Sequence, residues 1–135
     1  MTYLLDTNAC IAAINGRPPG LRRRLRDALG RGDAIALSTV TEFELRYGVA
    51  KSARAGENAE RLAIFLGPMT ILAFDGEDAR TAGEVRADLE RRGTPIGAYD
   101  LIIAGTALSR GLVLVTADMR EFRRVKGLRI ENCEN

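Results

Sequence analysis

The chain has 135 residues, 46% hydrophobic and 28% charged, and its 20 basic and 18 acidic groups leave a formal net charge of +2. This length and composition predict one globular domain, residues 1–135, and the charge balance favours no class of partner. No apolar run approaches the ~20 residues of a membrane span, and the first residues do not form a secretory leader. Two cysteines and no histidine argue against a zinc site or a disulfide framework. We therefore expect a cytoplasmic protein without a membrane partner.

Strands and helices alternate along the chain. Short apolar runs predict strands at residues 3–5, 34–37, 70–73, 112–115 and 128–130. Apolar residues at helical spacing predict helices at residues 8–14, 21–29, 39–53, 57–66, 76–92, 98–109 and 119–123. Proline and glycine mark loops at residues 16–20 and 93–97. The alternation predicts an α/β fold, a three-layer α/β/α sandwich around a mostly parallel sheet of four to five strands.

The helix at residues 39–53 carries two acids that must be told apart. At about 100° per residue, one apolar face is formed by Val40, Phe43, Tyr47 and Ala50. Glu44 lies beside this face, whereas Glu42 points away from it and fits a capping box with Thr39. We therefore expect Glu44 in the interior and Glu42 on the surface. Leu45 and Val49 lie on a further side, which suggests that a partner chain covers the helix there.

Three other carboxylates occupy places that suggest a shared site. Asp6 directly follows the first strand and Asp118 follows the strand at 112–115, so parallel strands would bring both to one edge of the sheet. Asp100 lies in the first turn of the most apolar helix, where the helix dipole alone could also account for an acid. We expect four acids from four separate segments to converge: Asp6, Glu44, Asp100 and Asp118.

Four carboxylates in one pocket repel one another strongly in a low dielectric. A divalent cation removes that repulsion, and oxygen ligands without nitrogen or sulfur favour Mg²⁺ or Mn²⁺ over zinc. A cation held by carboxylates commonly meets phosphate oxygens, where it can activate a water and stabilise a leaving oxygen. The four acids therefore predict hydrolysis of a phosphodiester.

At these residues the chain resembles the PIN-domain nucleases, and among them the VapC toxins of bacterial toxin–antitoxin pairs. The matching segments cover nearly the whole chain, in order, at residues 4–8, 38–48, 85–89, 93–97, 99–104 and 114–122. The resemblance implies the same α/β/α sandwich and a metal-dependent endoribonuclease that inhibits translation and growth. Its substrate would be RNA, often transfer RNA in close relatives.

The resemblance also implies roles for single residues. Asp6, Asp100 and Asp118 would ligate Mg²⁺ or Mn²⁺, the last of them directly or through water. Glu44 would position the attacking water, and the product would carry a 5′ phosphate and a 3′ hydroxyl. Asn8 and Thr116 match positions that orient the carboxylates by hydrogen bonds. A homodimer is implied as well, held silent by a VapB-type antitoxin whose C-terminal segment crosses the acidic site.

Other classes of function remain open on the sequence alone. A PIN-like module could bind RNA or protein without cutting it, although all four acids are present. A haloacid-dehalogenase-like phosphotransferase needs a second Asp two residues after the first, and this chain has Asn8 there. A receiver-type signalling domain needs paired acids after the first strand, and a dinucleotide-binding domain needs the G-x-G-x-x-G turn. The chain has neither feature.

Overall fold

Five parallel strands form the centre of the molecule in a computed structural model that describes residues 1–134. They are β1 (Thr2–Leu5), β2 (Ala34–Ser38), β3 (Thr70–Leu72), β4 (Val113–Thr116) and β5 (Arg129–Asn132), paired in the order β3-β2-β1-β4-β5. Leu5 of β1 pairs with Val115 of β4, so these two strands end side by side. The parallel sheet predicted from the alternating pattern is confirmed, and β5 is an edge strand as expected.

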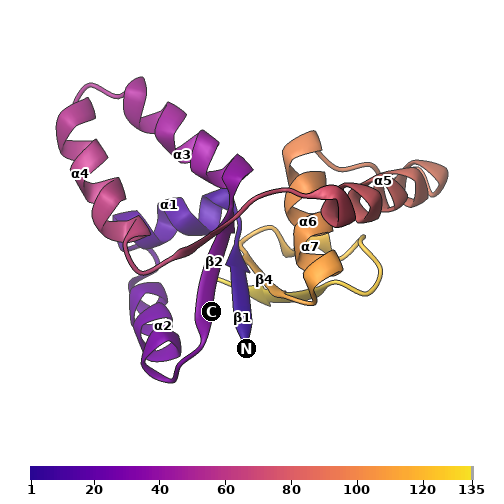
Figure 1. The fold of residues 1–135 in the computed structure, drawn as a ribbon, viewed down its shortest axis with the longest axis horizontal. Coiled ribbons are helices and arrows are strands. Elements are labelled where there is room, and N and C mark those ends of the chain that lie inside the picture. The colour runs from indigo at the N-terminus through magenta and orange to yellow at the C-terminus, as the bar shows by residue number, and fades with distance from the viewer. Residues whose placement is uncertain (135) are drawn as a thin grey trace.

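Helices cover both faces of this sheet, which gives the predicted three layers (Figure 1). One side carries α1 (Thr7–Asn15), α2 (Pro19–Gly30), α3 (Thr39–Ala50) and α4 (Ala55–Leu66), and the other carries α5 (Gly76–Arg91), α6 (Ala98–Arg110) and α7 (Met119–Phe122). Successive side chains of a strand point to opposite faces of the sheet and so belong to different cores. Leu5 packs with α1 and α2, whereas Leu4 packs with α5 and α6. Within the described residues, no helix combines the length and apolarity that crossing a bilayer requires.

Helix α3 begins at residue 39 as predicted, but its capping residue differs from the predicted one. Ser38 is the capping residue, and its Oγ accepts a hydrogen bond from the Val40 N–H at 3.0 Å. Thr39 is already helical, so the proposed capping box of Thr39 and Glu42 is wrong. Glu42 instead forms an exposed ion pair with Arg46 one turn later, at 2.8 Å. The helix also ends at residue 50 rather than 53.

The buried face of α3 is not the predicted one. Leu45 is buried in one core with Leu62 of α4, and Val49 packs against the same core. Phe43 and Tyr47, expected inside, are 56% and 58% exposed. Two apolar stripes run along this helix, and periodicity alone could not tell which one the protein covers. The chain itself therefore covers the Leu45 side, and the uncovered apolar stripe is that of Phe43 and Tyr47.

Helices α5 and α6 approach each other closely at Gly105. A Cβ added to Gly105 would lie 2.6 Å from the Cβ and 2.9 Å from the Cα of Ala82. Atoms this close would overlap, so the absence of a side chain at Gly105 is what allows the two backbones to meet. This contact fixes the position of α6, the helix that carries Asp100 in its first turn.

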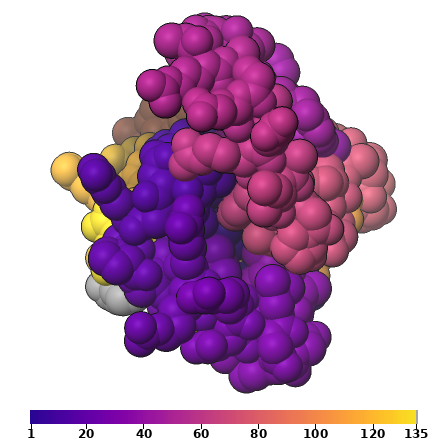
Figure 2. All heavy atoms as spheres, turned by 90° about the vertical axis from the view of Figure 1, so that its left-hand side faces the viewer, coloured from indigo at the N-terminus to yellow at the C-terminus, as the bar shows by residue number. Residues whose placement is uncertain are grey.

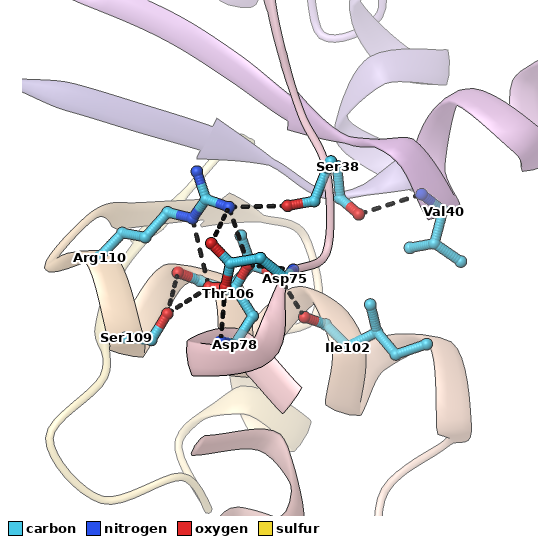
Figure 3. Close-up of polar contacts among 9 residues, drawn as sticks. Ser38, Val40, Asp75, Asp78, Ile102, Thr106, Ser109 and Arg110 are labelled. Carbon is cyan, nitrogen blue, oxygen red and sulfur yellow. Dashed lines mark hydrogen bonds and ion pairs between the residues drawn. The ribbon is translucent and has the colours of Figure 1, made fainter. Parts of the chain in front are cut away.

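A buried carboxylate joins the start of α5 to the end of α6 (Figure 3). Asp78 and Asp75 cap α5 reciprocally. The Asp78 carboxylate also accepts hydrogen bonds from Arg110 Nη2 at 2.8 Å and from the Ser109 hydroxyl. Burial alone would raise the pKa of Asp78, but the bonds from Arg110, Asp75 and Ser109 outweigh it and hold that pKa below its ordinary value. Arg110 further donates to the Ala73 carbonyl at 2.7 Å.

We expect Gly105→Ala to destabilise the protein by about 1–3 kcal/mol, because the added methyl must push α5 away from α6. Gly83→Ala is the matched control on α5, where an added Cβ meets nothing within 4 Å. The better helix propensity of alanine should stabilise that variant by up to about 1 kcal/mol. Thermal unfolding followed by circular dichroism measures both. An equal gain in stability in the two variants would contradict the close approach.

Asp78→Asn should destabilise the protein by about 3 kcal/mol at about pH 7, because Arg110 loses its buried anionic partner. The folded-state pKa of Asp78 is lowered, so its stabilisation is present above the ordinary value of 3.8 and shrinks as pH falls below it. Urea unfolding at neutral and acidic pH measures the difference. Glu77→Gln, which removes an exposed pair with Arg80, serves as control and should change stability by less than about 1 kcal/mol. An Asp78→Asn deficit that did not shrink in acid would refute the ionic role.

Candidate functional site

Asp6 is held at the carboxyl end of β1 by two hydrogen bonds. It is the N-cap of α1, with Oδ1 accepting from the Ala9 N–H at 2.8 Å. Oδ2 accepts from the hydroxyl of Thr116, the last residue of β4, at 2.5 Å. The side chain is only 4% exposed. The orientation of Asp6 therefore follows from the pairing of β1 with β4, and Thr116 is the orienting residue that the sequence suggested.

Asp118 lies two residues beyond β4 and is linked to Asp6 through Thr116. Its N–H donates to Thr116 Oγ1 at 2.8 Å, while that hydroxyl donates to Asp6. The carboxylate of Asp118 caps α7, because Oδ1 accepts from the Glu121 N–H at 3.0 Å. One threonine hydroxyl thus sets the relative placement of two predicted site acids.

Glu44 reaches the site from α3 and is partly buried. Its Oε1 accepts a hydrogen bond from Thr7 Oγ1 at 2.7 Å, next to Thr41 in the first turn of α3. Thr7 therefore makes the orienting contact that was expected of Asn8. Asn8 itself is exposed, and within residues 1–134 its side chain makes no hydrogen bond to a site carboxylate. The expected interior position of Glu44 is partly correct, because the side chain is half-buried rather than buried.

Asp100 lies in the first turn of α6, partly buried, and faces a second acid. Burial, then a hydrogen bond with the neighbouring Glu121 carboxyl and the charges of Glu121, Asp6 and Asp118, together raise the pKa of Asp100 to about 7. Glu121 Oε1 also accepts from the Gly97 N–H at 3.4 Å. The sequence reasoning missed Glu121. Its spacing from Asp118, three residues on and therefore one helical turn away, was the signal that could have revealed it.

These acids are close enough for their charges to act on one another. Burial raises the pKa of Asp6, the hydrogen bonds from Thr116 and Ala9 lower it, and the charges of Asp118 and Glu44 raise it again. The charges of Asp6 and Asp118 likewise raise the pKa of Asp100. The structure thus gathers the four predicted acids at the carboxyl edge of the sheet and adds Glu121 to them.

The donor set fits a hard cation that keeps part of its water shell. In residues 1–134, no three His, Cys, Asp or Glu side chains stand in a group tight enough to hold a metal ion unaided. Mg²⁺ does not need such a group, because it is commonly held by one or two carboxylates plus water and substrate phosphates. Carboxylates that raise one another's pKa, with no nitrogen or sulfur ligand among them, suit Mg²⁺ or Mn²⁺.

Two hollows adjoin α4 on the side of the molecule that carries α1 to α4. One, of about 240 Å³, is lined from α1, α3 and α4 and includes Glu44. The other, of about 410 Å³, lies between α2 and α4, with apolar walls and the three arginines Arg22, Arg26 and Arg61. Figure 2 shows this face, hollowed between the indigo and magenta segments. The site acids other than Glu44 line neither hollow, so the reactive edge is distinct from the larger apolar groove.

Comparison with known proteins places the chain in a family. The PIN domain family matches residues 3–128. The tRNA(fMet)-specific endonuclease VapC of Salmonella typhimurium is 41% identical over 132 residues, 98% of each chain, and the ribonuclease VapC2 of Rickettsia felis is 39% identical over 134 residues, 99% of each. The crystal structure of VapBC2 from Rickettsia felis, bound to a DNA fragment from their promoter, matches with a TM-score of 0.92 over 98% of both chains at 39% identity. The chain therefore belongs to the PIN domain family, among its VapC ribonucleases.

Proposed function

We propose that this chain is a metal-dependent endoribonuclease and the toxin of a toxin–antitoxin pair. The observation that carries this proposal is the gathering of Asp6, Asp100 and Asp118 at one edge of the sheet, with Glu44 and Glu121 beside them. A transfer RNA is the first substrate to test, because the relative from Salmonella typhimurium is named for its specificity toward tRNA(fMet).

Asp6, Asp100 and Asp118 are the residues that would hold the cation. When bound, Mg²⁺ or Mn²⁺ would offset the repulsion among these acids and act as a Lewis acid toward the scissile phosphate. Thr116 and Ala9 fix the Asp6 carboxylate before any ligand arrives, so this group is preorganised. Asp100, whose pKa is raised to about 7, would become fully ionised on meeting a cation.

Glu44 would serve as the group that orients the attacking water. The Thr7 hydroxyl donates to Oε1, which holds the carboxylate in place and leaves Oε2 to accept a proton. The water oxygen would bond to phosphorus while the bond from phosphorus to the 3′ oxygen breaks. The departing 3′ oxygen takes up a proton, so the products carry a 5′ phosphate and a 3′ hydroxyl.

A VapB-type antitoxin and a homodimer complete the proposal. Support for the antitoxin comes from the VapBC complexes among the matching structures, two of which hold DNA. The apolar groove between α2 and α4 shows that the chain exposes surface suited to a protein partner. The homodimer follows from the family resemblance, and sedimentation of the purified chain measures it.

Cleavage of purified tRNA(fMet) tests the nuclease directly. We expect cutting with Mg²⁺ or Mn²⁺, none with a chelator, and a loss of about 100-fold or more in rate for Glu44→Gln. Glu42→Gln is the matched control, because it changes the same kind of side chain on the same helix, in an exposed pair with Arg46. It should cut like the wild type. Undiminished cutting in chelator, or by Glu44→Gln, would reject the proposed site.

Growth of a bacterial host tests the toxin and its partner. We expect induction of the wild-type chain alone to stop growth, and co-expression of the protein encoded beside it to restore growth by forming a complex that co-purifies. Asp6→Asn should permit growth without the partner, because it removes a charge that the cation requires while Asn can still cap α1. Free growth on expression of the wild-type chain alone would count against a toxin.

A further inference from the structure

A basic surface lies where the end of α5 meets the segment that follows α7. Residues 86–92 and 123–126 contain six basic and two acidic residues, a surplus of four positive charges in a chain whose formal net charge is +2. Arg92 Nη2 donates to the Arg124 carbonyl at 2.5 Å, which holds the two segments side by side. We call these residues, 86–92 and 123–126, the α5–α7 basic surface.

Three cations of this surface act on one carboxylate. Asp88 accepts from Arg92 Nη2 at 2.7 Å and pairs with Arg91 at 3.7 Å. The hydrogen bond from Arg92 is the largest of the causes that hold the pKa of Asp88 below its ordinary value, against a smaller opposing effect of desolvation. The charges of Lys126 and Arg91 lower that pKa further. A single carboxylate cannot neutralise three cations, so the surface keeps a positive charge to offer an anion.

The loop of residues 93–97 connects the α5–α7 basic surface to the site acids. Arg124 Nη1 donates to the Pro95 carbonyl at 3.0 Å. Two residues further on, the Gly97 N–H donates to Glu121 Oε1 at 3.4 Å, and Glu121 is the acid that neighbours Asp100. The basic surface and the acidic site therefore adjoin the same short loop, and one extended polyanion could lie on both.

The composition of this surface favours a double-helical occupant. Surfaces that bind unpaired bases use aromatic rings for stacking, and residues 86–92 and 123–126 include no aromatic residue. The centre of a stable protein interface is depleted in charged residues, which argues against another protein chain. A base-paired RNA helix is recognised mostly through its phosphates and sugars. Two arginines held by backbone carbonyls, Arg92 and Arg124, give such a helix a preorganised basic surface.

We propose that the α5–α7 basic surface binds phosphates of a base-paired arm of the RNA substrate and thereby places the strand to be cut over the acidic site. This inference rests on the proposed function, since it takes the acids as the place of cutting. Arg123 and Lys126 are exposed and form no ion pair within residues 1–134, so they are the side chains assigned to the phosphates. Phosphate contacts position a nucleic acid without reading its sequence. The surface would therefore select RNA by the position of a stem relative to the cut.

Equilibrium binding of a labelled RNA hairpin tests the proposal. Every variant also carries Glu44→Gln, so that the RNA stays intact. Arg123→Gln combined with Lys126→Gln should weaken binding by about tenfold at about 100 mM salt, and should lower the slope of log affinity against log salt by about two. The matched control is Arg23→Gln combined with Arg26→Gln, which removes the same charge from α2 on the other side of the sheet and should change neither quantity (Figure 1). A linear RNA with the loop sequence alone should bind all variants equally.

Each other outcome overturns the inference. An equal loss in the α2 control would show that affinity follows net charge alone. Normal hairpin binding without Arg123 and Lys126, or the same loss for the linear RNA, would exclude contact with a stem. Surface-dependent binding of a DNA hairpin but not of the RNA hairpin would assign the surface to DNA. Unchanged RNA binding with loss of the co-purifying protein would assign it to a protein partner.

Cleavage of the same RNA hairpin, with Glu44 restored, separates this inference from the proposed function. Loss of Arg123 and Lys126 should raise KM and leave kcat unchanged, because these residues hold the substrate and do not touch the reacting atoms. Cleavage with an unaltered KM would reject this inference alone. Surface-dependent binding of the hairpin without any cleavage would reject the proposed nuclease alone.

Discussion

Repulsion among carboxylates is the constraint on which the carboxyl edge of this sheet depends. Asp6 is almost fully buried, and the charges of Glu44 and Asp118 act on it there. A buried anion of this kind is costly unless hydrogen bonds or an opposite charge compensate it. Thr116 and the first turn of α1 supply the hydrogen bonds. No Lys or Arg forms an ion pair with Asp6 within residues 1–134, and we propose that a bound cation supplies the opposite charge.

The rest of the fold keeps these groups together despite their repulsion. The pairing of β1 with β4 places Asp6 beside Thr116, and through it beside Asp118. Helix α6, which carries Asp100, is fixed along its length by the approach of Gly105 to α5 and at its end by the buried pair of Arg110 and Asp78. An acid on a loosely packed helix would move away from its neighbours. The contacts between α5 and α6 therefore contribute to the site although they lie away from it.

The sequence allowed the sheet, the layers and most of the site to be predicted, for an identifiable reason. Buried strands are continuous apolar runs, and the acids that follow them, Asp6 and Asp118, stand out against that background. The exposed face of α3 could not be predicted, because the Phe43 stripe is as apolar as the Leu45 stripe and only the placement of α4 decides between them. The spacing of Glu121 from Asp118 was the one signal of its role in the sequence, and that role also depends on the position of Asp100 in space, which the sequence does not give.

The most direct test of charge crowding is the unfolding temperature near neutral pH, with Mg²⁺ and with chelator at equal ionic strength. We predict that Asp100→Asn melts at a higher temperature than the wild type in chelator, because it removes one of the repelling charges. Mg²⁺ should then raise the melting temperature of the wild type more than that of the variant. Equal melting of the two proteins in chelator, with no response of either to Mg²⁺, would contradict an acidic site that a cation stabilises.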